Sequence, residues 1–203
     1  MKRPSLINAI KKRTAVVAVG PSDARGQGTS GVVKALREAL DCVPLAAFAT
    51  SEQQKFEQAL DRWTSKVRAG LPEKAQSWGL ARKCLNCFLR DCFYNIYLVN
   101  HWGLACAEGL FEVPLDSIVA KRIREEEEKA GKSLPPWPGL KHLTPEVSKL
   151  YQRAALVQSE ARHLSRVHLD TYLWVPPSWA RKASSHDAQA SRRRDVRGVL
   201  PHV

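Results

Sequence analysis

The chain has 203 residues, of which 44% are hydrophobic, and this length and composition are typical of one globular domain with a substantial core. The formal net charge is +12 at pH 7, and most of it lies at the two ends of the chain. We therefore expect a basic arm at 1–13, a central domain at 14–175 and a flexible basic tail at 176–203. Basic ends bind the phosphate backbone of nucleic acids, although they also occur as solubilising tails.

The sequence excludes two other classes of protein. No segment is as long and apolar as a membrane span, and the first residues lack the apolar region of a secretory signal. The five cysteines are an odd number, and four of them lie between 84 and 106, which is unlike the disulfide framework of a secreted protein. We therefore expect a cytoplasmic protein with reduced thiols and no contact with membranes.

Hydrophobic periodicity predicts a mainly α-helical domain. The single strand candidate is the apolar run 14–19, and the glycine-rich stretch 26–31 follows it. Helices are predicted over 32–40, 51–67, 80–98, 116–130 and 144–163, with a final apolar segment at 167–175. Ser51, Asp116 and Thr144 are the expected N-caps of three of these helices.

The predicted helix 80–98 is the most apolar of the set. Its hydrophobic residues recur every three or four positions and end with Ile96 and Tyr97, so we expect all of it to be buried at the centre of the fold. Its cysteines fall on that apolar face and favour core packing over a metal site.

The spacing G-x-G-x-x-G at 26–31 is found in dinucleotide-binding folds. Those folds need parallel strands, for which this chain has too few candidates. A flexible loop or a backbone contact with a phosphate is the favoured interpretation.

Lys83 and Asp116 are the candidate catalytic residues. A lysine near the start of a helix and partly buried should have a lowered pKa, and its neutral amine could attack a sugar carbon. An aspartate that caps the next helix would stay ionised and could stabilise a positively charged sugar. The simpler alternative is an exposed lysine and a purely structural cap.

The segments around these two residues resemble those of the helix-hairpin-helix DNA glycosylase superfamily, the endonuclease III-like enzymes. Residues 78–83, Trp-Gly-Leu-Ala-Arg-Lys, are similar to the hairpin segment P-G-V-G-R-K, and residues 114–123 are similar to the segment V-D-T-H-V-x-R-V. The interval from Lys83 to Asp116 is similar to that of the archaeal 8-oxoguanine glycosylases. The resemblance covers about half of the chain and implies that Lys83 forms a Schiff base and that Asp116 is the catalytic aspartate, with Asp170 as a rival.

The resemblance implies a two-lobed helical domain that binds double-stranded DNA as a monomer, flips out a damaged or modified base and cleaves its N-glycosidic bond, with or without abasic-site lyase activity. Such an enzyme would act in repair or in defence against modified foreign DNA. The implied DNA contacts are Gln27, Trp78, Gly79, Arg82 and Lys121, and Trp174 is the candidate for stacking on the base. No cofactor, metal or iron-sulfur cluster is implied. The alternative is a non-catalytic helical nucleic-acid-binding or adaptor protein.

Overall fold

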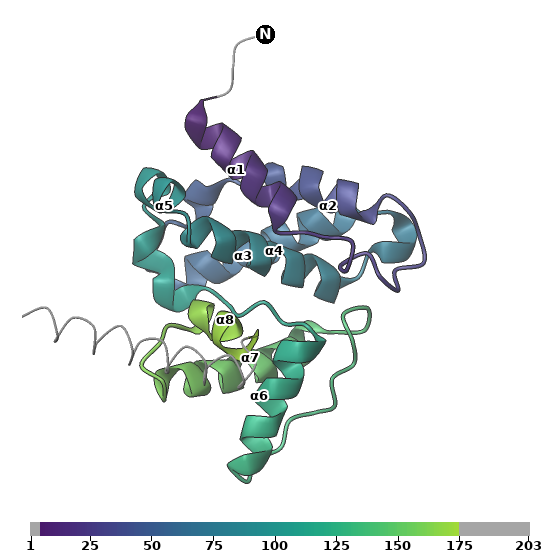
Figure 1. The fold of residues 1–203 in the computed structure, drawn as a ribbon, viewed down its shortest axis with the longest axis vertical. Coiled ribbons are helices and arrows are strands. Elements are labelled where there is room, and N and C mark those ends of the chain that lie inside the picture. The colour runs from purple at the N-terminus through teal and green to yellow at the C-terminus, as the bar shows by residue number, and fades with distance from the viewer. Residues whose placement is uncertain (1–4, 175–203) are drawn as a thin grey trace, which may run out of the picture.

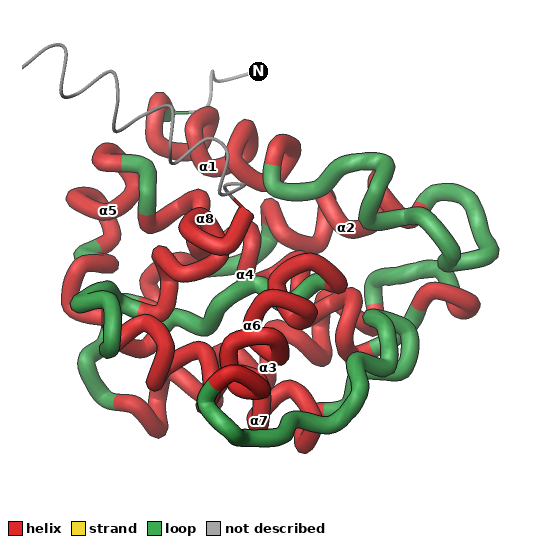
Figure 2. The backbone as a smooth tube through the Cα atoms, turned by 60° about the horizontal axis from the view of Figure 1, so that its bottom comes forward, coloured by secondary structure: helices red, strands yellow, loops and turns green. Residues whose placement is uncertain are grey.

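The computed structural model describes residues 5–174, and within them the chain forms helices and loops without a strand (Figures 1 and 2). The α-helices are α1 (Leu6–Val17), α2 (Val32–Asp41), α3 (Gln53–Ala69), α4 (Trp78–Phe93), α5 (Ile96–Trp102), α6 (Ser117–Lys129), α7 (Pro145–Glu160) and α8 (Leu169–Trp174). Four 3₁₀-helices connect them: η1 (Leu45–Phe48), η2 (Glu73–Ala75), η3 (Leu104–Leu110) and η4 (Arg166–His168). The predicted mainly α-helical class is confirmed.

The buried side chains form two separate hydrophobic clusters. The larger cluster lies among α1–α5 and includes Leu36, Phe56 and Leu85. The smaller cluster lies among α6–α8 and includes Ile123 and Tyr151. Figure 1 shows α1–α5 in the upper part of the molecule and α6–α8 in the lower part. A seam between two packed groups of helices is therefore present, and the segment after η3 crosses it.

Helix α4 is the central element, as expected, but the long helix predicted over 80–98 is two helices. Asn95 interrupts it because its side chain accepts hydrogen bonds from the amides of Tyr97 and Leu98 and so caps a new helix, α5. The change of direction leaves Ile96 63% and Tyr97 58% exposed, so their predicted burial was wrong.

The strand predicted at 14–19 was also wrong, because residues 14–17 form the end of α1 and Ala18 is its C-cap. Ser5 caps that helix, and Ile7, Ile10 and Thr14 place apolar or buried side chains at helical spacing along it. Most of the range expected to form a basic arm is therefore the first half of α1. Its basic side chains project from a helix that packs on the larger cluster.

The structure tests the three predicted N-caps. Asp116 accepts hydrogen bonds from the amides of Ile118 and Val119, and Thr144 accepts one from the amide of Val147, so both caps are confirmed. Ser51 is not a cap, because α3 begins later, at Gln53, and its N-cap position has no side-chain hydrogen bond.

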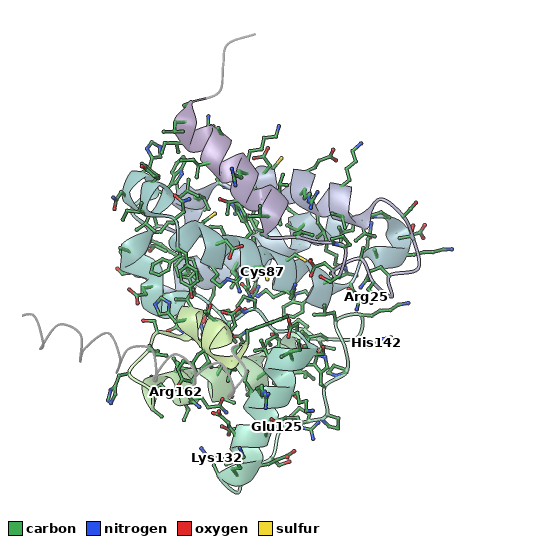
Figure 3. All side chains as sticks on the ribbon, in the orientation of Figure 1. Arg25, Cys87, Glu125, Lys132, His142 and Arg162 are labelled. Carbon is green, nitrogen blue, oxygen red and sulfur yellow. The ribbon has the colours of Figure 1, made fainter. Side chains whose placement is uncertain are left out.

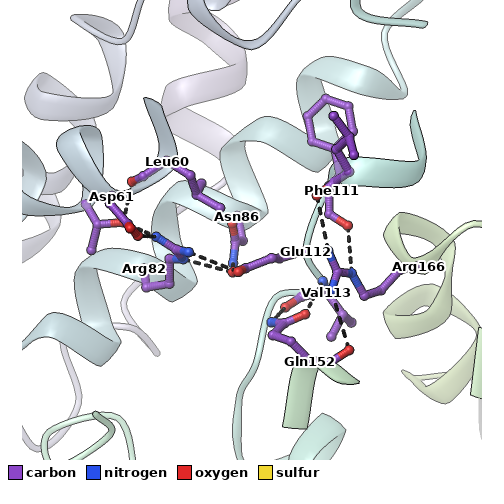
Figure 4. Close-up of polar contacts among 11 residues, drawn as sticks. Leu60, Asp61, Arg82, Asn86, Phe111, Glu112, Val113, Gln152 and Arg166 are labelled. Carbon is purple, nitrogen blue, oxygen red and sulfur yellow. Dashed lines mark hydrogen bonds and ion pairs between the residues drawn. The ribbon is translucent and has the colours of Figure 1, made fainter. Parts of the chain in front are cut away.

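Polar side chains hold the two groups of helices together at the segment that crosses the seam (Figure 4). Arg82 donates two hydrogen bonds to the Glu112 carboxylate, at 2.8 and 2.9 Å, and Asn86 donates a third at 2.9 Å. The Gln152 side chain bonds both the amide and the carbonyl of Val113, and Arg166 donates to the carbonyls of Leu110 and Phe111. This interlobe junction sets the position of the smaller cluster relative to α4.

Gly79 allows the loop before α7 to pack closely against α4. A Cβ atom at this position would lie 2.6 Å from Cβ of Leu143 and still closer to the Leu140 carbonyl oxygen. We expect Gly79→Ala to lower the free energy of unfolding by about 1–3 kcal/mol, as overpacking does. Urea unfolding would measure the change. Gly109→Ala is the control, because a Cβ there meets nothing within 4 Å, and an equal loss in both variants would contradict the steric explanation.

Candidate functional site

A cleft of about 890 Å³ opens along the seam between the two groups of helices. One wall comes from the end of α1, the loop after it and one face of α4, and the other comes from the start of α6 and from α8. Figure 3 shows Cys87, which lines the cleft, where the two groups of helices meet. The volume lies within the range of about 300–1,000 Å³ that is usual for small-molecule sites.

Lys83 and Asp116 both line this cleft, although 33 residues separate them in the chain. Lys83 reaches it from the second turn of α4, and Asp116 from the first residue before α6. The cleft therefore contains the amine and the carboxylate that the sequence analysis singled out. It also contains Asp170, the rival carboxylate, on α8.

Lys83 is not a free amine, because its Nζ donates a hydrogen bond to Oδ1 of Asp23 in an ion pair. Both side chains are largely buried, with 13% of Lys83 and 7% of Asp23 exposed. The other carboxylate oxygen of Asp23 accepts a hydrogen bond of 2.8 Å from the amide of Gly20. The amine is thus held from the loop that follows α1.

The predicted lowering of the Lys83 pKa was wrong. Burial would lower this pKa, but negative charge on Cys87, Cys84 and Asp23 outweighs burial, and the net shift is upward from the ordinary 10.5. Burial also raises the pKa of the Cys87 thiol to about 11 and that of Cys84 well above 9.0. Of these three groups, Asp23 is the one that forms a hydrogen bond and an ion pair with Nζ of Lys83.

Asp116 differs from the other cleft carboxylates, Asp23, Asp91 and Asp170, because each of those forms an ion pair. Its Oδ1 atom accepts the two amides at the start of α6. Between residues 5 and 174, no lysine, arginine or histidine forms an ion pair with it. Its Oδ2 atom accepts no hydrogen bond from any residue in that span and is thus available to a ligand in the cleft.

Asp170 is already engaged within the protein. Its side chain is 2% exposed and forms an ion pair with Arg90, which also donates to Asp91. Burial raises the pKa of Asp170, and the Arg90 guanidinium opposes that shift only in part. The Arg90 guanidinium thus occupies the space between two carboxylates of the cleft, and Asp116 remains the better candidate to contact a sugar.

Two aromatic side chains line the same cleft, Tyr94 and Trp174. Tyr94 stacks on the ring of His168 with an angle of 3° between the rings, and its hydroxyl lies 3.2 Å from Nδ1 of that histidine. Trp174, the residue predicted to stack on the base, is 53% exposed. Flat exposed rings at a cleft of this size can stack on a nucleobase.

The structure gives most of the expected DNA contacts other roles. Arg82 is buried in the interlobe junction, Trp78 faces its guanidinium at 5.3 Å, and Gly79 packs against the loop before α7. The segment expected to form the hairpin is helical from Trp78 onward, and Ser77 accepts the amides of Leu80 and Ala81. Arg82 and Gly79 are therefore unavailable to DNA in this conformation.

Gln27 and Lys121 differ in their access to solvent. Gln27 is only 5% exposed, so it cannot fill the gap left by an extruded base in this conformation, and its Oε1 atom has no hydrogen-bond partner among residues 5–174. Lys121 has 74% of its side chain exposed on α6, five residues after Asp116, and its Nζ lies 3.8 Å from Oε1 of Glu125 in a surface ion pair.

Sequence reasoning missed Asp23 and Arg90. Asp23 lies in a polar turn after an apolar run, where an aspartate side chain usually hydrogen bonds to the backbone of the turn. Arg90 lies two turns after Lys83 on α4, and this spacing was the one signal that could have placed it on the Lys83 face.

The predicted core packing of the cysteines is confirmed for Cys84 and Cys92, which belong to the larger hydrophobic cluster. Cys87 lies beside Lys83 in the cleft instead. Within 5–174, no three histidine, cysteine or acidic side chains come together as a metal site would require.

Comparison with protein families, with curated proteins and with solved structures gives no match for this chain. None of the helices in 5–174 has the length and hydrophobicity needed to cross a lipid bilayer.

Proposed function

We propose that this protein is a DNA N-glycosylase of the helix-hairpin-helix type, which takes a damaged or modified nucleotide into the cleft and cleaves the bond between base and sugar. The observation that carries the proposal is the placement of Lys83 and Asp116 in one cleft, from opposite sides of the seam. A cleft between two packed groups of helices suits a base that has left the duplex.

The chemistry of the cleft supports this reaction. The bond between C1′ and the base nitrogen breaks, and its electron pair leaves with the base. In hydrolysis, a water adds its hydroxyl to C1′, and the proton of that water goes to the departing base. The Asp116 carboxylate stabilises the positive charge that develops on the sugar. In a lyase reaction, Nζ of Lys83 then bonds to C1′, which requires that the ammonium first gives up a proton.

The distribution of charge supports a polyanion as partner. The cleft carries the carboxylates Asp23, Asp91, Asp116 and Asp170 against only two cations, although the whole chain has a net charge of +12. Positive charge is thus concentrated outside the cleft, where a duplex backbone would lie while one nucleotide enters. Lys121, on α6, is the exposed cation that we place at a phosphate.

The proposal is tested with duplexes that each carry one oxidised purine, one oxidised pyrimidine or one modified base of foreign DNA. Mass spectrometry of the supernatant identifies released bases, and borohydride traps any Schiff base formed on abasic DNA. We expect base release from at least one duplex and covalent trapping by the wild-type protein. Lys83→Gln should abolish trapping and leave DNA binding nearly intact.

Lys34→Gln is the matched control, because it removes a lysine of α2 whose side chain is 81% exposed and does not line the cleft, and it should keep trapping. Trapping that persists in Lys83→Gln would refute the assignment of that residue. Absence of both base release and trapping, together with DNA binding that weakens steeply as salt rises, would refute the enzyme and establish the non-catalytic binding protein.

A further inference from the structure

Asp23 occupies a position that the proposed chemistry leaves unexplained. It belongs to the loop between α1 and α2, and one of its carboxylate oxygens is held by the Gly20 amide while the other accepts the Lys83 ammonium. The Asp23 side chain is 7% exposed and bonds both to the backbone of its own loop and to Lys83. Its role therefore extends beyond stabilising the turn.

We propose that Asp23 is a positioning residue that holds the Lys83 amine in the cleft, keeps it protonated in the free protein and accepts its proton when the amine reacts. This inference rests on the proposed function, since it concerns the nucleophile of that reaction. In the transfer, one N–H bond of Lys83 breaks and the proton moves to Oδ1 of Asp23. The lone pair left on Nζ forms the bond to C1′ of the sugar cation that base departure leaves, and the C1′–O4′ π pair returns to the ring oxygen.

The other groups around Lys83 do not replace Asp23 in this role. From α4, Cys84 and Cys87 are neutral thiols at pH 7, and Arg90 is a cation that is paired with Asp91 and Asp170. From the start of α6, Asp116 faces the cleft and caps its own helix. Asp23 is the one carboxylate between residues 5 and 174 that hydrogen bonds to Nζ of Lys83.

The backbone of the loop places Asp23 independently of α4. The Asp23 amide donates to the Gly20 carbonyl and the Arg25 amide to the Ser22 carbonyl, which forms consecutive turns. Further along, Gly28 has a φ of 71°, a left-handed conformation that costs glycine little. Because these turns are formed by backbone hydrogen bonds, the variant Asp23→Asn can keep the turn while it removes the negative charge.

The first experiment measures the protonation of Lys83 without DNA. Limited reductive methylation with formaldehyde over pH 6–11, followed by mass spectrometry, gives the pH at which each lysine becomes reactive. In the wild-type protein we expect the Lys83 midpoint above the ordinary 10.5. In Asp23→Asn, burial still lowers this pKa and Cys87 and Cys84 still raise it, but the Asp23 charge and its hydrogen bond are lost. The midpoint should therefore fall by about one unit, and labelling at pH 8 should rise about tenfold.

Asp91→Asn is the matched control, because it removes a carboxylate from the same cleft that does not touch Lys83. The Lys83 midpoint should be nearly the same in this control as in the wild-type protein. A Lys83 midpoint that is equal in Asp23→Asn and wild type, or a wild-type midpoint below 10, would overturn the proposal. The wild-type titration keeps this test decisive even if Asp23→Asn fails to fold.

The second experiment follows borohydride trapping on abasic DNA over the same pH range. In the wild-type protein, trapping should increase about tenfold per pH unit between pH 7 and 10, because the fraction of neutral amine does so. The profile of Asp23→Asn should shift to lower pH. If labelling shifts and neither protein is trapped, the proposed function fails and the role of Asp23 stands. If the wild-type protein is trapped and Asp23→Asn has an unchanged profile, the role of Asp23 fails.

Discussion

Replacement of Asp116 by Asn is expected to slow base release by about 10²–10³-fold, because one preformed charge at the developing sugar cation is lost. An asparagine side-chain oxygen can still accept the amides of Ile118 and Val119, so α6 should keep its N-cap and the protein its fold. Single-turnover base release from the duplex identified in the screen gives the rate, and circular dichroism checks the helices.

The matched control for this prediction is Asp170→Asn, which changes the rival carboxylate in the same cleft. Because Asp170 is buried and paired with Arg90, its loss should lower the free energy of unfolding and leave most of the base release per folded molecule. A larger loss of rate in Asp170→Asn than in Asp116→Asn would reverse the two assignments.

Replacement of Arg82 by Met is expected to lower the free energy of unfolding by about 3–5 kcal/mol, the usual cost of removing one partner of a buried ion pair. The variant leaves the Glu112 carboxylate with Asn86 as its remaining hydrogen-bond donor in the interlobe junction. Urea unfolding of both proteins at pH 7 measures the difference. A double variant, with Glu112→Met added, should recover part of the loss, since no buried charge is left unpaired.

The pH dependence of the junction follows from Glu112. Burial would raise the pKa of this carboxyl, but the Arg82 guanidinium outweighs burial and the net shift is downward from 4.5. A carboxyl with a lowered pKa in the folded state stabilises the protein above its unfolded pKa and loses that contribution as the pH falls through its folded pKa. In Arg82→Met, burial raises the Glu112 pKa without the guanidinium to oppose it, so the difference between the two proteins should be larger at pH 7 than at pH 3 and decrease as Glu112 becomes protonated.

The stability difference between wild type and Arg82→Met, followed from pH 7 to pH 3, checks this sign. A difference that grows as the pH falls, or that is absent at pH 7, would show that the junction is not a source of stability.

Several expectations from sequence were confirmed because they depend on neighbours in the chain. The helical class, the N-caps Asp116 and Thr144 and the buried face of α4 follow from residue spacing and from side chains that bond amides two or three positions away. The strand at 14–19 was wrong because an apolar run of that length fits a strand or a helix equally well, and only the upstream Ile7 and Ile10 indicate the helix.

The state of Lys83 was beyond such reasoning. Its pKa depends on Asp23, 60 residues earlier in the chain, and that contact exists only because the loop after α1 packs against α4. The role of Arg82 was also beyond such reasoning. The sequence predicted a contact with a DNA phosphate, whereas the fold pairs Arg82 with Glu112, 30 residues later in the chain.

By itself, the sequence determined the mainly helical class, the N-caps Asp116 and Thr144 and the buried face of α4, because these properties arise within a few turns of chain. The tertiary structure alone decided that Lys83 and Asp116 line one cleft, and that the lysine is a paired ammonium. Distances and electrostatic fields between segments far apart in sequence arise only when two groups of helices pack across a seam.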